Sequence, residues 1–132
     1  FDEKYDLKIV TEKKPSNNQL EDLKFAWKLC SFVKSNAIIL AKNKTLLGMG
    51  AGQPNRVMSV KIAGEVAGEK SIGCVMASDA FFPFPDSIIK ASDLGIKSII
   101  QPGGSINDSD VIEEANNRGI SMIFTNQRRF TH

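Results

Sequence analysis

Three short segments of this sequence hold residue types that could bind a small molecule. Residues 78–86 carry three phenylalanines and two prolines, residues 101–108 include a Pro-Gly-Gly-Ser turn, and residues 125–130 contain two arginines. Aromatic faces suit planar rings, small residues expose backbone groups, and guanidinium groups bind anions in bidentate fashion. If the segments meet, they would suit a planar heterocycle that carries an anionic group.

The sequence leaves structural alternatives open for each segment. Phe81, Phe82 and Phe84 could be core residues, although a Phe-Phe-Pro-Phe-Pro run is stiff and hard to bury on every side. The two glycines of residues 103–104 could form a plain tight turn. The arginines of residues 128–129 could lie on a solvated tail. The three segments taken together favour a ligand site more than any one of them does.

A glycine-rich segment, residues 48–52, precedes a predicted helix that carries Arg56 in its first turn. Its amides could hold an anion at the helix N-terminus, with Arg56 adding a bidentate charge. The segment is not a G-x-G-x-x-G motif, because Gln53 stands at the last glycine position, and no P-loop lysine follows. A structural turn is an equally good interpretation.

Metal chemistry and histidine-assisted nucleophiles have little support in this sequence. The only histidine is His132, and Cys30 and Cys74 are isolated from each other and from any Cys-x-x-Cys pair. The ligand motif of zinc deaminases is therefore missing, and a serine or cysteine nucleophile has no histidine partner. The remaining candidate polar groups are Lys34, Asn36, Asp79 and Asp86.

Strands and helices alternate along the predicted fold. A capping box at Ser16 and Gln19 begins a helix that we expect to run to about residue 34. The other predicted helices span residues 55–67, 86–94 and 108–118, and the predicted strands span residues 7–10, 37–41, 45–49, 72–77, 96–100 and 120–124. This alternation predicts an α/β sandwich with largely parallel strands. The three segments follow strand ends, so they should converge on the rim where such sheets bind ligands.

Length and composition fit one globular domain. The chain has 132 residues, 42% hydrophobic and 24% charged, and a net charge of +2 that gives no argument for nucleic-acid binding. No apolar run approaches the ~20 residues of a membrane helix. Two cysteines are too few for a disulfide framework, and no signal peptide is visible, so we expect a cytoplasmic protein.

Several of these segments resemble one enzyme family in register over about residues 6–132. They are Phe-Val-Lys-Ser-Asn-Ala at 32–37, Gly-Met-Gly-Ala-Gly-Gln at 48–53 with Arg56, Ser-Asp-Ala-Phe-Phe-Pro-Phe at 78–84, Gln-Pro-Gly-Gly-Ser-Ile at 101–106 and Phe-Thr-Asn-Gln-Arg-Arg-Phe-Thr-His at 124–132. They are similar to the carboxyl-terminal end of the bifunctional AICAR transformylase/IMP cyclohydrolases. The resemblance implies a three-layer, cytidine-deaminase-like α/β domain with a mixed, largely parallel sheet and no zinc.

The resemblance also implies an activity in purine biosynthesis. The family transfers a formyl group from 10-formyltetrahydrofolate, a cosubstrate, to the 5-amino group of AICAR without a catalytic metal. A separate amino-terminal domain then closes the ring to IMP, and the transformylase sites form across a homodimer. AICAR and folate are therefore the implied ligands, with no nucleic acid or membrane as partner.

Individual residues take their implied roles from the same resemblance. Asn36 matches an active-site asparagine near the transferring formyl group. Arg56, Phe81 and Arg128 match residues that contact AICAR.

Four further positions match residues that hold the folate: Val57, Asp86, Ser105 and Ile106. Pro85 departs from the family, which usually carries arginine before that aspartate, so the charge around Asp86 should differ.

What the sequence lacks matters as much for the expected activity. The family's chemistry depends on an upstream Lys-His pair that is absent here, as is the cyclohydrolase domain, and the sequence begins at Phe1 without an initiator methionine. We therefore expect residues 1–132 to be a single-domain fragment of the transformylase region, inactive by itself. The alternative is a non-catalytic module that binds nucleotide or folate, or that only dimerises.

Overall fold

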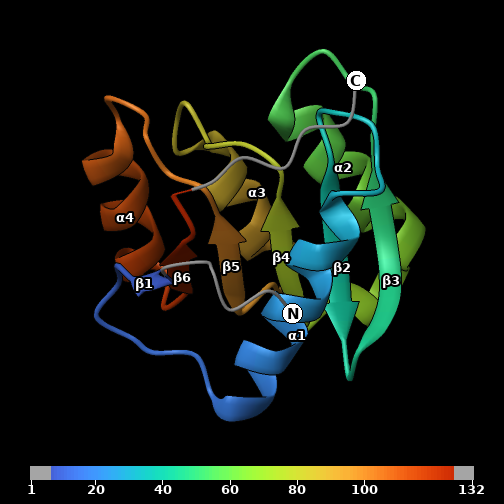
Figure 1. Cartoon of the computed structure of the whole chain (residues 1–132), viewed down its shortest axis with the longest axis horizontal. Coiled ribbons are helices and arrows are strands. Elements are labelled where there is room, and N and C mark those ends of the chain that lie inside the picture. The colour runs from blue at the N-terminus through green and yellow to red at the C-terminus, as the bar shows by residue number, and fades with distance from the viewer. Residues whose placement is uncertain (1–6, 127–132) are drawn as a thin grey trace.

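Six strands form one sheet with helices on both faces in the computed structural model, which describes residues 7–126 (Figure 1). In chain order the elements are β1 (Lys8–Ile9), α1 (Asn17–Cys30), β2 (Ile38–Lys42), β3 (Thr45–Gly50), α2 (Arg56–Ala67), the 3₁₀ helix η1 (Gly68–Ser71), β4 (Val75–Ser78), α3 (Asp86–Asp93), β5 (Ser98–Gln101), α4 (Asp108–Asn117) and β6 (Ser121–Phe124). The strands lie in the order β1-β6-β5-β4-β2-β3.

The sheet is mixed, with a parallel centre. Strands β4, β5 and β6 are parallel neighbours, whereas β1 and the β2–β3 hairpin add antiparallel strands at the two sides. The predicted alternation of strands and helices is confirmed. Strand β4 begins later than predicted, because Gly73, near the start of the expected strand, has a left-handed backbone (φ 82°) that interrupts it.

Alternating side chains of the strands build two cores, one on each face of the sheet. Helix α1 covers one face, where Leu23 and Trp27 pack with Ile39 of β2. Helices α2, α3 and α4 cover the other face, where Val60 and Ile88 are part of a core that includes Met76 of β4. The result is the predicted three-layer arrangement, visible in Figure 1.

Helix α1 begins as predicted and ends sooner. The Ser16 hydroxyl accepts a hydrogen bond from the Gln19 amide (3.1 Å), and the Gln19 side chain accepts one from the Ser16 amide (2.9 Å). After Cys30 the amides of Phe32 and Val33 bond three residues back, which tightens the chain into a turn. The helix therefore ends at Cys30 and not near residue 34.

The hairpin turn between β2 and β3 is held in place by hydrogen bonds to helix α1. Asn43 and Lys44 both have positive φ (53° and 54°), as a two-residue turn of the hairpin type requires. The Asp22 carboxylate of α1 accepts hydrogen bonds from both of their amides, at 3.0 and 2.8 Å. This contact fixes the hairpin against α1.

Two of the three glycines of residues 48–52 serve packing, which corrects the interpretation of this segment as one anion-binding loop. Gly48 and Gly50 lie within β3. A Cβ at Gly48 would overlap the carbonyl oxygen of Ala63, and a Cβ at Gly50 would overlap that of Ser59. Both glycines are needed because the backbone of α2 crosses β3 at close range.

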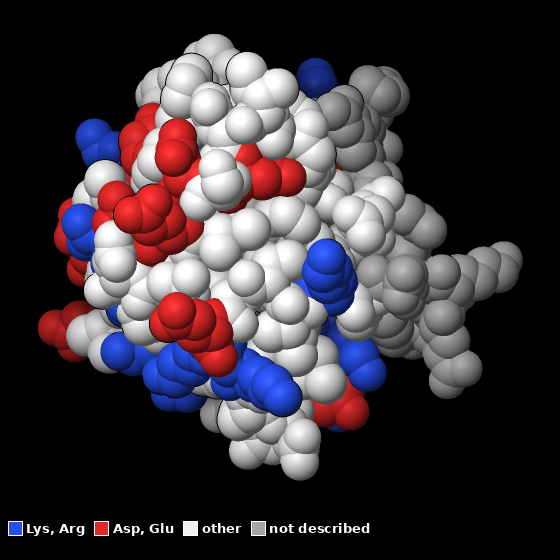
Figure 2. Space-filling model, turned by 90° about the vertical axis from the view of Figure 1, so that its left-hand side faces the viewer, with Lys and Arg blue, Asp and Glu red and all other residues white. Residues whose placement is uncertain are grey.

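The surface beside α4 carries charges of both signs. Figure 2 shows acidic side chains gathered in one part of this face and basic side chains in another. Helix α4 itself has Asp108 and Asp110 in its first turn, where the helix dipole favours acidic residues. No helix within residues 7–126 is long and apolar enough to cross a membrane.

Candidate functional site

Strand β2 begins, and strands β3 and β4 end, at the same edge of the sheet, and the connections there form a cleft. Ile38, the first residue of β2, pairs with Gly50 at the end of β3 and with Ser78 at the end of β4. The segment before β2, the loop between β3 and α2, and the loop after β4 are therefore neighbours. The β-sheet register thus brings together residues that are more than forty positions apart in the sequence.

Two cavities of about 280 Å³ each lie side by side in this cleft. They share Asn55, Arg56 and Pro83. Arg56, the first residue of α2, therefore forms part of the boundary between the two cavities. The first cavity is completed by Asn36, Pro54, Ala80 and Phe81. The second is completed by Val57, Phe84, Asp86 and Ser87.

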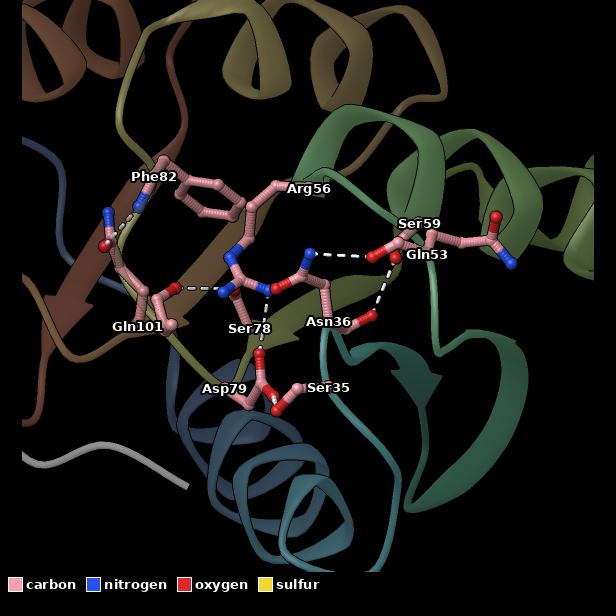
Figure 3. A network of polar contacts seen from close by, with 10 residues as sticks. Ser35, Asn36, Gln53, Arg56, Ser59, Ser78, Asp79, Phe82 and Gln101 are labelled. Carbon is pink, nitrogen blue, oxygen red and sulfur yellow. Dashed lines mark hydrogen bonds and ion pairs between the residues drawn. The ribbon is translucent and has the colours of Figure 1, made fainter. Parts of the chain in front are cut away.

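A buried ion pair lies at the base of the cleft (Figure 3). The Nη1 atom of Arg56 is 2.9 Å from Oδ1 of Asp79, and the two side chains are 11% and 0% exposed. The other carboxylate oxygen of Asp79 accepts a hydrogen bond from the Ser35 hydroxyl at 2.6 Å. Both oxygens of the buried carboxylate are thus satisfied, as such a charge requires.

Asn36 is held between this ion pair and the loop before α2. Its Nδ2 atom donates to the carbonyl of Gln53 (2.8 Å), and its own carbonyl accepts from the Ser59 hydroxyl (2.7 Å). Figure 3 shows the amide lying between Gln53 and Arg56. One amide N–H is used inside the protein, which leaves the second N–H and the amide oxygen for a ligand.

The phenylalanines of the loop after β4 have three different environments. Phe81 is half-buried and lines the first cavity, Phe82 is fully buried in the core, and Phe84 is 58% exposed at the second cavity. The Phe82 amide donates to the side-chain oxygen of Gln101 at 3.3 Å, which ties this loop to the end of β5. The core interpretation therefore holds for Phe82 alone.

The residues expected to hold folate divide into two groups. Val57 and Asp86 both line the second cavity, although Pro85 precedes Asp86 without a charge of its own. The Asp86 carboxylate accepts a hydrogen bond from the Ser87 amide at 2.9 Å, within the first turn of α3. The structure thus brings together Asn36, Arg56, Val57, Phe81 and Asp86 in one cleft.

Ser105 and Ile106 lie apart from both cavities. The Ser105 amide donates to Asp108 (3.1 Å), and Ile106 is 99% exposed. Their loop is connected to the cleft through Asn107, whose side chain donates to the carbonyl of Pro83 at 2.8 Å. The loops after β4 and β5 share one rim as predicted, but the cleft forms on the β2–β3–β4 side of it. Arg128 lies outside the described residues.

The cysteines do not contribute reactive thiols to the site. Cys30 and Cys74 are both buried and free. Burial raises the pKa of the Cys30 thiol well above its ordinary value, with the Asp79 carboxylate adding to the effect. Burial likewise raises the pKa of Cys74 to about 12. Among residues 7–126 there is no group of three or more His, Cys, Asp or Glu residues suited to a metal ion.

Sequence reasoning missed two groups that fix the site residues. Ser35 binds the buried carboxylate, and the Gln53 carbonyl orients the Asn36 amide. Both lie inside segments that were noticed for other reasons. Only their contact with residues distant in the sequence reveals these roles.

Solved structures with similar folds place the domain in a structural class. Two crystal forms of RibD from Acinetobacter baumannii match with a TM-score of 0.54 and 17% identity. The match to form 2 covers 81% of this chain and 34% of that protein. The domain is therefore an α/β domain of the cytidine-deaminase-like class, as predicted, and within its described part no metal-binding group was found.

Sequence comparisons then give the family. Residues 1–66 match the model of the AICARFT/IMPCHase bienzyme family, and the chain belongs to this family. The bifunctional purine biosynthesis protein PurH of Trichodesmium erythraeum is 58% identical over 127 residues, covering 96% of this chain and 25% of that protein. Its counterpart in Dictyostelium discoideum is 55% identical over 125 residues, covering 95% of this chain and 23% of that protein. The chain thus spans about a quarter of the length of these relatives.

Proposed function

We propose that this chain forms the AICAR- and folate-binding part of a formyltransferase that acts in purine biosynthesis. One observation carries the proposal. Five residues that were assigned from sequence resemblance alone line two adjoining cavities. One was assigned as the active-site asparagine, two were assigned to AICAR, and two were assigned to folate. These residues come from three separate connections between elements of the sheet, so their proximity in space does not follow from their proximity in the sequence. The assembled family enzyme also closes the ring to IMP through another domain.

The first cavity suits a nucleotide, provided that a second cation balances the phosphate charge. Phe81 supplies an aromatic surface for the imidazole ring, and Arg56 supplies hydrogen-bond donors for anionic or carbonyl oxygens. The Arg56–Asp79 pair has no net charge, so a phosphate would need another positive group. Arg128 is the residue we assign to that role.

The second cavity suits the folate cosubstrate. Val57 offers an apolar contact and Asp86 a carboxylate that can accept hydrogen bonds from a pterin ring. Because the cavities share Arg56 and Pro83, two ligands bound there would meet at a common boundary. Ser105 and Ile106 would contribute only from the rim, through the loop that Asn107 attaches to Pro83.

The proposed reaction needs no metal. The 5-amino nitrogen of AICAR attacks the formyl carbon, a new C–N bond forms, and the bond between that carbon and N10 of the folate breaks. A proton leaves the amine and another reaches N10. Preorganised donors stabilise the oxyanion of the tetrahedral intermediate, and the free N–H of Asn36 is our candidate for one of them.

A proton acceptor has to come from outside this sequence. The only histidine is His132, and no Lys-His pair is present. We therefore propose that the chain binds ligands but does not turn over alone, and that the active protein is a cytoplasmic homodimer with the complete site. The competing function is a module that binds nucleotide or folate without catalysis.

Steady-state kinetics of the complete gene product test these assignments. Asn36→Ala should lower kcat by about a hundredfold or more, as removal of an oxyanion donor does, with little change in either KM. Arg128→Ala should raise the KM for AICAR about 10-fold or more, because a charged hydrogen bond is lost. Asn117→Ala, an exposed position at the end of α4, is the matched control. A change confined to KM in Asn36→Ala would contradict its catalytic role.

A further inference from the structure

Asp79 is a buried carboxylate that no ligand in the cleft can touch. Its side chain is 0% exposed, and it lines neither cavity. One of its oxygens bonds the Arg56 guanidinium at 2.9 Å, and the other accepts the Ser35 hydroxyl at 2.6 Å. Its backbone amide donates to the carbonyl of Ala37 at 3.2 Å, which fixes the carboxylate against the start of β2.

This arrangement ties together the two segments that supply the first cavity. Arg56 opens α2, and Ser35 directly precedes Asn36. An arginine side chain is long and flexible, and a ligand that orders it loses binding free energy in doing so. An arginine already oriented by a buried carboxylate can contact a ligand without that loss.

We propose that Asp79, supported by Ser35, is a positioning residue that presets the Arg56 guanidinium for an anionic or carbonyl group of the substrate. It acts on the ligand through Arg56 and, by way of Ser35, on the segment that carries Asn36. The proposal rests on the proposed function only for the identity of the ligand, AICAR. The positioning of Arg56 itself does not depend on which ligand binds.

Two opposite effects of removing the carboxylate charge can be distinguished. If Asp79 only neutralised Arg56, Asp79→Asn would leave a more positive cleft and would tighten the binding of an anion. If Asp79 positions Arg56, the weaker neutral hydrogen bond would release the guanidinium and weaken binding. The short contacts to both carboxylate oxygens, in a site without solvent exposure, favour positioning.

The test uses the complete gene product with Asp79→Asn, Ser35→Ala and, as a matched control, Asp93→Asn at the exposed end of α3. For Asp79→Asn we expect the KM for AICAR to rise about 10-fold or more, and for Ser35→Ala about 3-fold, with the KM for folate within about twofold of its original value. The control should leave both values unchanged. Ser35→Ala keeps the ion pair and therefore keeps the test open if Asp79→Asn folds poorly.

A second readout follows Arg56 itself. The rate at which phenylglyoxal modifies Arg56, measured by peptide mass spectrometry, should rise several-fold in Asp79→Asn and stay constant in Asp93→Asn. An unchanged modification rate, a tighter KM for AICAR, or equal increases in both KM values would overturn the positioning role. Faster modification with an unchanged KM for AICAR would leave the positioning intact and would contradict the assignment of Arg56 to AICAR.

Discussion

Changing each of the three phenylalanines of the loop after β4 to alanine should have a different effect on stability and on substrate binding. Phe82 is fully buried among core residues of the α2–α4 face, so Phe82→Ala removes a large side chain and leaves a cavity. Such changes cost about 3–5 kcal/mol. For a chain of 132 residues that corresponds to a fall in Tm of roughly 10–20 °C. Phe84 is 58% exposed, and Phe84→Ala should stay within about 0.5 kcal/mol of the original stability.

Phe81→Ala should behave differently from both. Its ring is half-buried and lines the first cavity, so the loss of stability should be small. Stacking of a base on an aromatic side chain is worth about 1–3 kcal/mol, which predicts a rise of about 5- to 160-fold in the KM for AICAR. Urea unfolding and formyl-transfer kinetics on the same preparations provide both readings. Equal losses of stability in Phe82→Ala and Phe84→Ala would refute the assignment of Phe82 alone to the core.

Other expected outcomes concern the packing of α2 and the two thiols. Gly48→Ala should lower the free energy of unfolding by about 1–3 kcal/mol or more, because its Cβ would overlap the Ala63 carbonyl. Gly64→Ala, whose Cβ would meet movable side-chain atoms of Leu94 as its nearest neighbours, should cost less in the same urea titration. Cys30 and Cys74 should resist a thiol reagent in the folded protein at pH 8 and react fully in denaturant. Because the folded pKa of Cys74 exceeds the ordinary 9.0 and reaches about 12, the unfolded chain loses this proton first. The stability from that difference is complete below about pH 9 and falls as the pH rises toward 12, which alkaline unfolding curves would measure.

Local patterns in the sequence predicted most of the elements. The capping box at Ser16 marked the start of α1 correctly, and alternating helices and strands indicated the parallel centre of the sheet. The end of α1 and the start of β4 were predicted less well, because a tightened turn follows Cys30 and the left-handed Gly73 delays the strand. Such changes depend on packing between layers, which a local pattern does not contain.

The site was predictable only as a set of residue types. The sequence indicated aromatic, guanidinium and amide groups near strand ends, but the pairing of Ile38 with both Gly50 and Ser78 decides which of these ends adjoin. The glycines of residues 48–52 show the converse error. Their composition fitted an anion-binding loop and a structural turn equally well, whereas Gly48 and Gly50 have a packing role that depends on where α2 crosses β3.

Residues that act through others were the hardest to find from sequence. The sequence indicated Asp79 as one of four candidate polar groups but assigned it no particular role. Its importance comes from complete burial together with contacts to Arg56 and Ser35, which are 23 and 44 positions away. Contacts over such separations are set by the sheet register.

A formyl-transfer assay tests the central claim most directly. The complete gene product and this chain, each at the same concentration, would be given AICAR and 10-formyltetrahydrofolate, and formation of formyl-AICAR would be followed. We predict turnover by the complete protein, and none by this chain, whose sequence contains no Lys-His pair. Turnover by this chain alone would show that the essential base lies within it. No turnover by the complete protein would contradict the proposed formyltransferase function.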